Sequence, residues 1–281
     1  LIASTKLRKA RAELDRTRPY FDALRSEIKR IFRTVEGVES RYFYPGDDHP
    51  LSGTYAYLVI TADKGLAGMY NQNVLREAQR LLNEHADAKL FVVGEYGRQY
   101  FAHHQIPVER SFLYTAQNPT MQRAREISNT LLELYDSGKV QKIFVIYTDM
   151  KNTMTEEAKS TRLLPFHRQT FASRPEEKAV RTPFTFEPSI ETVLDTLIPS
   201  YVSGFIYSAL VDSFCSEQNA RMTAMRAAND NAEALLASLS SDYQRLRQAE
   251  ITQEITEITA GAAAQRRNAR EAQTLCTQAI S

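Results

Sequence analysis

The last 77 residues of the chain, from Phe205 to Ser281, contain almost nothing that ends a helix. All ten prolines lie between Pro19 and Pro199, and after Gly204 the only glycine is Gly261. A stretch without such breakers favours one continuous helix, about 115 Å long at ~1.5 Å per residue. Residues with the a/d spacing of a coiled coil recur within it: Met222, Met225, Asn229, Ala232, Leu236, Leu239, Tyr243 and Leu246.

The N-terminal residues carry the same helical period. Pro19 interrupts this pattern without shifting its phase, which predicts a kinked but continuous helix. Residues 1–44 hold 11 Lys and Arg against 6 Asp and Glu, a net charge of +5 that the rest of the chain nearly cancels. The apolar positions are Ala3, Leu7, Ala10, Leu14, Phe21, Leu24, Ile28, Ile31 and Val35, with Thr17 in phase.

Between these two helices the sequence alternates between strand-like and helix-like segments. Short β-branched and aromatic runs predict strands at 54–61, 89–93, 107–113 and 140–148, and a further strand near 158–164. Helical patterns separate them near 71–86, 95–104 and 119–137, and 167–188 reads as an irregular connection. This alternation is typical of a βαβ domain with a mainly parallel sheet.

The predicted fold is therefore of the α/β class, with the βαβ-type domain inserted into a long antiparallel coiled-coil hairpin. We divide the chain into an N-terminal helix (1–44), an α/β domain (45–187) and a C-terminal helix (188–281). About 36 residues of the first helix can cover only a similar length of the last. From about residue 243 onward the apolar stripe, with Ile251, Ile255 and Ile258, needs another protein.

Composition excludes several classes of protein. Charge is balanced, with 35 Lys and Arg against 34 Asp and Glu, which argues against a dedicated nucleic-acid binder. Cys215 and Cys276 form neither a disulfide framework nor a CxxC motif, which favours a reducing compartment. No apolar run approaches the ~20 residues of a membrane span. The chain starts at Leu1 in mid-pattern, which is consistent with a native N-terminus that begins upstream.

The loop TADKGLAGMYN, residues 61–71, stands where a phosphate-binding loop would. It matches neither GxGxxG nor GxxxxGK[ST], because Lys64 precedes both glycines. A structural turn or a partner surface is favoured over a nucleotide site, and Asp63 could form a surface ion pair with Lys64.

Other candidate chemistry also has a simpler structural interpretation. His103 and His104 point about 100° apart on a helix and cannot both face one metal. Nothing near Glu254 and Glu257 would separate their pKa values, as an acid/base pair requires. Cys215 is most simply a helix residue, and Asp47, Asp48 and His49 most simply form a loop turn.

Residues 216–264, SEQNARMTAMRAANDNAEALLASLSSDYQRLRQAEITQEITEITAGAAA, closely resemble the C-terminal signature of the γ subunit of F-type ATP synthases. Three other segments resemble the same family in the same order: STKLRKAR, TADKGLAG and FEPSIETVLDTLIPSYV. The resemblance implies a rotor rather than a catalyst, with no cofactor, metal or catalytic residue of its own. In that family the coiled coil turns inside a ring of α and β subunits, and the globular foot docks on the ε subunit and the c ring.

The resemblance also implies roles for particular residues. Arg247, Gln248 and Thr252 match positions that contact a loop of β, and Lys6, Arg8 and Lys9 match a basic stretch that faces β. Foot residues in the region that meets ε and the c ring are Phe184, Phe186, Glu187 and Tyr207. The implied location is peripheral, on the cytoplasmic face of a bacterial plasma membrane, with an organellar inner membrane as the alternative.

Three departures from the family keep other functions open. First, the family's helix begins several turns before Leu1. Second, its loop carries a cysteine and a glycine where this chain has Ala67 and Met69. Third, Gln265–Ser281 extend beyond its usual end. A second hypothesis is therefore a γ-like coiled-coil adaptor that has lost torque transmission. A third is an α/β enzyme that binds a nucleotide at the loop from Asp63 to Gly68.

Overall fold

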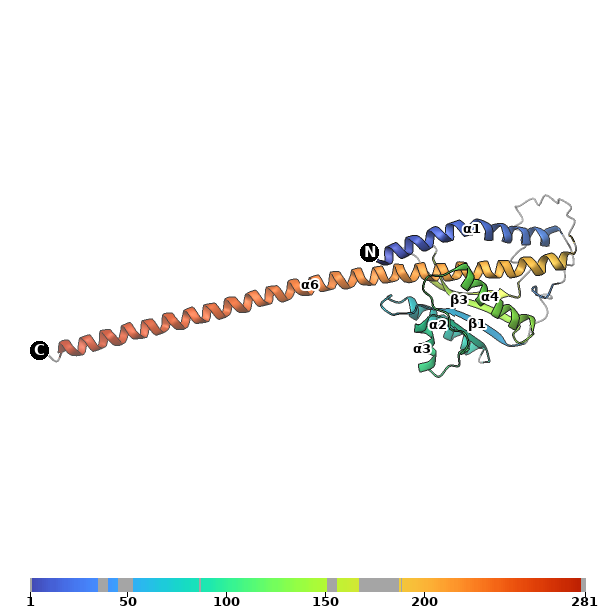
Figure 1. Cartoon of the computed structure of the whole chain (residues 1–281). Helices are drawn as coiled ribbons and strands as arrows, with labels where there is room; N and C mark the ends of the chain where they lie inside the picture. Colours follow the sequence, from blue (N-terminus) through green and yellow to red (C-terminus); the bar gives the residue numbers. More distant parts are fainter. Residues whose placement is uncertain are drawn as a thin grey trace. The chain divides into compact units, whose positions relative to one another are not determined.

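The computed structural model describes residues 2–34, 40–44, 53–85, 87–150, 156–166, 187 and 189–278. The chain forms two compact units, Leu1–Met225 and Arg226–Ser281, and its last helix belongs to both. In chain order the elements of Figure 1 are α1 (Ile2–Thr34), β1 (Tyr55–Ile60), α2 (Tyr70–Glu84), β2 (Lys89–Val93), α3 (Glu95–His103), α4 (Met121–Asp136), β3 (Lys142–Met150), β4 (Glu156–Leu164) and α6 (Ile190–Gln278).

The four strands form one mixed sheet in the order β2-β1-β3-β4. Strand β1 is parallel to both β2 and β3, with Tyr57 opposite Leu90 and Phe144, whereas β4 is antiparallel to β3. Parallel neighbours require crossover connections, which α2 and the segment containing α3 and α4 supply. The α/β class, three predicted helices and all predicted strands except one are confirmed.

The predicted strand at 107–113 is wrong. Glu109 N–H donates to the Leu90 carbonyl across 2.9 Å, but Phe112 N–H turns back to the Glu109 carbonyl across 3.3 Å. Pro107 has no N–H to give to a ladder. The segment therefore lies along β2 as a turn-containing loop, with one isolated bridge between Val93 and Tyr114.

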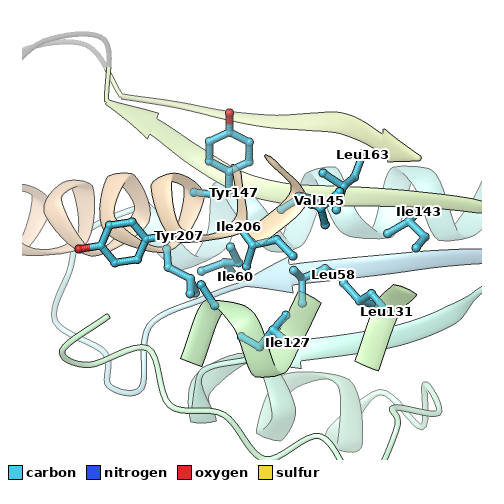
Figure 2. Packing of buried hydrophobic residues seen from close by; sticks show 14 of the residues in the cluster. Leu58, Ile60, Ile127, Leu131, Ile143, Val145, Tyr147, Leu163, Ile206 and Tyr207 are labelled. Atoms are coloured by element: carbon cyan, nitrogen blue, oxygen red, sulfur yellow. The ribbon is translucent and has the colours of Figure 1, made fainter. Parts of the chain in front are cut away.

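Both faces of the sheet are buried, because alternate side chains of each strand point to opposite sides. On one face, Tyr57 and Val59 pack against α2 and α3. On the other, Leu58 and Ile60 pack against α4 and α6, through residues such as Ile206 (Figure 2). The inserted domain thus contributes its core to the same cluster that holds the two helices.

Helix α1 lies along the first part of α6 and runs antiparallel to it (Figure 1). The charge of Lys6, near the start of α1, interacts electrostatically with the carboxylate of Glu217. The charge of Arg25, further along α1, interacts in the same way with the phenol of Tyr201. The helix is continuous through Pro19, as predicted. The buried side chains of α1 in this contact are Leu7, Ala10, Ile28 and Ile31.

The three-part division predicted from the sequence stays a prediction. Its boundaries lie beside residues 45–52 and 167–186, which fall outside the described residues together with Pro188. The irregular connection predicted at 167–188 and the loop residues Asp47, Asp48 and His49 are therefore outside this description, apart from Glu187.

The apolar content of α6 bears on the expectation that no segment spans a membrane. By length and composition alone it is long and apolar enough to cross a membrane. Half of its most apolar window is buried inside the protein, as in a helix that packs into a core. Burial therefore accounts for this apolar stretch, and the likeness to a span is a weak indication.

Gly204 of α6 packs closely against Phe21 of α1. A Cβ added there would lie 2.0 Å from Cδ1 of Phe21, whose ring also packs against Tyr207. We expect Gly204→Ala to lower the free energy of unfolding of the full chain by about 1–3 kcal/mol, because the ring must be displaced. Urea titration followed by circular dichroism measures this change.

Gly261→Ala is the matched control for this prediction. Nothing lies within 4 Å of a Cβ at Gly261, so the substitution brings only the higher helix propensity of alanine, up to ~1 kcal/mol. Equal effects of the two substitutions would contradict the proposed close contact.

Candidate functional site

The loop that follows β1 is closed by the carboxylate of Asp63. Its Oδ1 accepts the N–H of Glu95 and of Ala116, each across 3.1 Å, and its Oδ2 accepts the N–H of Gln117 across 3.2 Å. A carboxylate that organises three backbone donors is a structural anchor, and its charge opposes a phosphate. This geometry supports a structural turn over a nucleotide site.

The tip of the same loop is exposed and partly apolar. Leu66 has φ of 64° and is 76% exposed, and Met69 is also exposed. A positive φ is uncommon for a residue with a bulky side chain such as leucine. Among the described residues, Asp63 forms no ion pair with Lys64, because its oxygens are engaged by the backbone.

Arg221 of α6 ties this loop to the long helix. Its Nη1 pairs with Oε1 of Glu217 across 2.5 Å, while Nη2 donates to the Gly65 carbonyl across 3.1 Å and the Lys64 carbonyl across 3.4 Å. Burial raises the pKa of Glu217, whereas the nearby Arg221 lowers it. The sequence analysis missed this clamp, although an i,i+4 acid–arginine pair in an otherwise apolar stretch could have indicated it.

Further polar contacts join α6 to the inserted domain. The hydroxyl of Ser203 donates to that of Ser128 on α4 across 2.9 Å in a buried position. Thr148 N–H, at the end of β3, donates to the Ser213 hydroxyl across 3.3 Å. The carboxyl of Asp212 faces this junction, and burial, followed by the charge of Asp149, raises its pKa to about 6.

The basic stretch of α1 divides between two faces. Lys6 and Lys9 lie three residues apart, so they share one face of the helix, and both line a cavity against α6. Arg8 is exposed on a different face. The structure therefore brings together two of the three basic residues that the sequence singled out.

Arg247, Gln248 and Thr252 lie in the second unit, on α6, and all three are exposed. Thr252 Oγ1 donates to the Gln248 carbonyl across 2.7 Å, which places these two residues on one face. Within the described part of the chain, the guanidinium of Arg247 forms no ion pair. Its five donors are thus available to a partner.

The second unit carries a long exposed apolar stripe. Its large apolar side chains are between 45% and 71% exposed. Such a stripe exceeds what an isolated helix keeps in water and marks an interaction surface. The residues are Leu235, Leu236, Leu239, Tyr243, Leu246, Ile251, Ile255 and Ile258.

The predicted foot residues have different surroundings. Glu187 is exposed, and Phe184 and Phe186 fall outside the described residues. Tyr207 is only 1% exposed and packs against the ring of Phe21. Its burial supports a packing role over contact with another subunit.

The other candidate residues lie where ordinary helix residues lie. His104 is exposed, with Nδ1 2.8 Å from the Tyr100 carbonyl. Glu254 and Glu257 are exposed, and Glu257 accepts from the Gln253 amide. Burial raises the pKa of Cys215 to about 11, so its thiol stays protonated. Across the described residues, no group of three or more His, Cys, Asp or Glu could hold a metal ion.

These features define a class of protein: an interaction protein with a helix pair, an inserted α/β domain and a long helix whose apolar stripe requires other chains. The protein-family model described as ATP synthase matches residues 1–265. The ATP synthase gamma chain of Caldanaerobacter subterraneus is 42% identical over 272 residues, covering 93% of this chain and 91% of that one. The ATP synthase gamma chain of Ruminiclostridium cellulolyticum is 40% identical over 267 residues, covering 94% and 90%.

A solved structure shares the fold. It is a chain in the Euglena gracilis mitochondrial ATP synthase assembly of OSCP, F1 and c-ring in rotational state 3, with a TM-score of 0.59. The two chains are 17% identical, and the match covers 93% of this chain and 95% of that one. This chain belongs to the ATP synthase gamma chain family, and it is a component of the membrane-associated ATP synthase complex.

Removing the Arg221 guanidinium should destabilise the protein in a pH-dependent way. In Arg221→Ala the buried carboxylate of Glu217 loses its ion-pair partner, so we expect a loss of about 3–5 kcal/mol in the free energy of unfolding near pH 8. A carboxyl whose pKa is raised in the folded state favours folding at low pH, and this contribution is lost as the pH rises through the folded pKa. The loss should therefore be smaller near pH 5.

Denaturant titrations at the two pH values test this prediction. Replacing the pair together, as Glu217→Gln with Arg221→Ala, should recover much of the stability at pH 8 and remove the pH dependence. The exposed Arg226→Ala serves as the control. A pH-independent loss in Arg221→Ala would show that Glu217 is not the group left uncompensated.

Proposed function

We propose that this chain is the central-stalk rotor subunit of an F-type ATP synthase. In this proposal it transmits torque from the membrane c ring to the β subunits and so couples proton transport to ATP synthesis or hydrolysis. The observation that carries the proposal is the exposed apolar stripe of α6 after Met225, in a chain of the gamma family. An apolar helix surface of this length is stable only when other chains surround it.

The proposed contacts with other subunits are made mainly by exposed side chains. Arg247, Gln248 and Thr252 would meet a β subunit, with the Arg247 fork on a carboxylate. Lys6, Arg8 and Lys9 would face acidic groups of β. Toward the ε subunit and the c ring, Glu187 is the exposed candidate, together with Phe184 and Phe186.

The chain itself would be non-catalytic. Two features support this: the loop after β1 is organised by an anionic anchor, and Cys215 is a buried, protonated thiol. ATP chemistry would occur in the β subunits. The complex would lie peripherally on the cytoplasmic face of a bacterial plasma membrane, with this chain between the α and β subunits and the membrane c ring.

Reconstitution tests the proposal and separates it from the adaptor hypothesis. The full chain is mixed with purified α and β subunits, and the mass and ATPase activity of the gel-filtration peak are measured. We expect a complex of three α, three β and one copy of this chain, with ATPase activity that depends on the chain. Entry into the ring without such activity would favour the adaptor, and ATP turnover by the isolated chain would contradict a non-catalytic role.

Arg247→Ala should lower the ATPase activity of the reconstituted complex more than it lowers assembly. One charge-assisted contact is worth about 1.5–3 kcal/mol, which is small beside the whole apolar surface of α6. The matched control is Arg245→Ala, two residues away, whose side chain is 79% exposed and pairs with Asp242. Loss of the complex with Arg247→Ala alone, or equal activity of the two variants, would contradict the proposed contact.

A further inference from the structure

A cavity of about 150 Å³ lies where α1, α6 and the segment before α4 meet. All of its lining belongs to the first unit. Neither the loop after β1 nor the apolar stripe of α6 is among its described lining residues. The lining residues are Lys6, Lys9, Ala10, Asn118, Pro119, Thr120, Tyr207, Val211 and Phe214.

The floor of this cavity is apolar. Ala10, Val211 and Phe214 are buried, and Tyr207 presents a side chain that is 1% exposed. These side chains come from both long helices, so the floor is held by the packing of α1 on α6. A volume of this size, lined by apolar groups, suits a ligand body about as large as benzene.

The rim of the cavity is cationic. Lys6 and Lys9 share one face of α1, and within the described residues neither ammonium group forms an ion pair. Among the described lining residues there is no Asp or Glu. Two like charges one helical turn apart repel each other, so an anion between them is favourable.

The first turn of α4 adds to this positive character. Thr120 caps α4, its hydroxyl accepting the N–H of Arg123 across 3.2 Å, and the first turn of that helix contains no acidic residue. Helix N-termini carry partial positive charge. The carboxylate of Glu217, which interacts with the charge of Lys6, is paired with Arg221 and is not among the described lining residues.

We propose that this cavity binds a small organic monoanion, a carboxylate attached to a short aliphatic chain or a single ring. The carboxylate would lie between the ammonium groups of Lys6 and Lys9, and the apolar body would rest on Ala10, Val211 and Phe214. A hydrated phosphate fits less well, because the apolar floor cannot replace its water. Lys6 and Lys9 are also the proposed contacts to β, so this site is assigned to the isolated chain, where no β subunit competes for their ammonium groups.

Titration of the full chain with hexanoate tests the proposal by calorimetry at low salt. We expect one saturable site with a Kd below about 1 mM, a reasonable limit for a ligand of eight heavy atoms. Hexanol supplies the body without the charge, and acetate supplies the charge without the body. Each should bind about tenfold more weakly or worse, and added salt should weaken hexanoate binding.

Two variants locate the site. Lys9→Gln removes one ammonium group and should weaken hexanoate binding about tenfold. Ala10→Met places a longer side chain in the cavity and should abolish binding, whereas Lys29→Gln, elsewhere on α1, should leave it unchanged. Melting curves by circular dichroism establish that each variant is folded, and bound hexanoate should raise the melting temperature of the unsubstituted chain.

Three results would overturn the proposal. They are the absence of saturable hexanoate binding up to about 10 mM, equal affinities for hexanoate and hexanol, and binding that Lys9→Gln and Ala10→Met leave unaltered. Each concerns the isolated chain, so failure here is distinct from failure to assemble with α and β subunits.

Discussion

The antiparallel packing of α1 on the first part of α6 is the contact on which the rest of the structure depends. Through it, Leu7 and Ile31 of α1 join one core with residues of α6 and of the sheet. Gly204 makes this approach possible, since any side chain at that position would meet the ring of Phe21. The sheet packs onto α6 in the same core, through Leu58 and Ile60.

Polar contacts give this packing a definite register. The apolar contacts between the sheet and α6 are non-directional. Hydrogen bonds have a definite geometry, and two of them join Ser203 to Ser128 and Arg221 to the carbonyl of Gly65. A rotor needs its foot and its long helix to turn together. In the proposed function these directional contacts would resist slippage between the inserted domain and α6.

The two units of the chain suit different tasks. In the first, α6 is covered by α1 and by the inserted domain, and its side chains up to Gln218 are largely buried. In the second, the same helix exposes its apolar stripe, and stability of that surface depends on other chains. The cavity beside Lys6 and Lys9 belongs to the first unit only, so a ligand there would act on the junction of the helix pair with the domain.

The sequence by itself determined the helices, most strands and the family. Helix breakers and heptad spacing define α1 and α6, and β-branched runs define β1, β2 and β3, because these signals are local. The run at 107–113 has strand composition but folds as a loop, since Pro107 and a turn at Phe112 interrupt the ladder. Strand-like composition alone does not indicate that Pro107 lacks the backbone N–H that a strand ladder requires.

Only the tertiary structure decided which polar groups meet. Tyr207 resembles a surface contact residue in sequence, yet it is buried against Phe21, and Asp63 is occupied by three backbone donors from segments far along the chain. Lys6 and Lys9 acquire a shared cavity only because α6 returns beside α1. These relations join residues separated by tens to hundreds of positions, and side-chain packing, which no local periodicity encodes, selects among the possible partners.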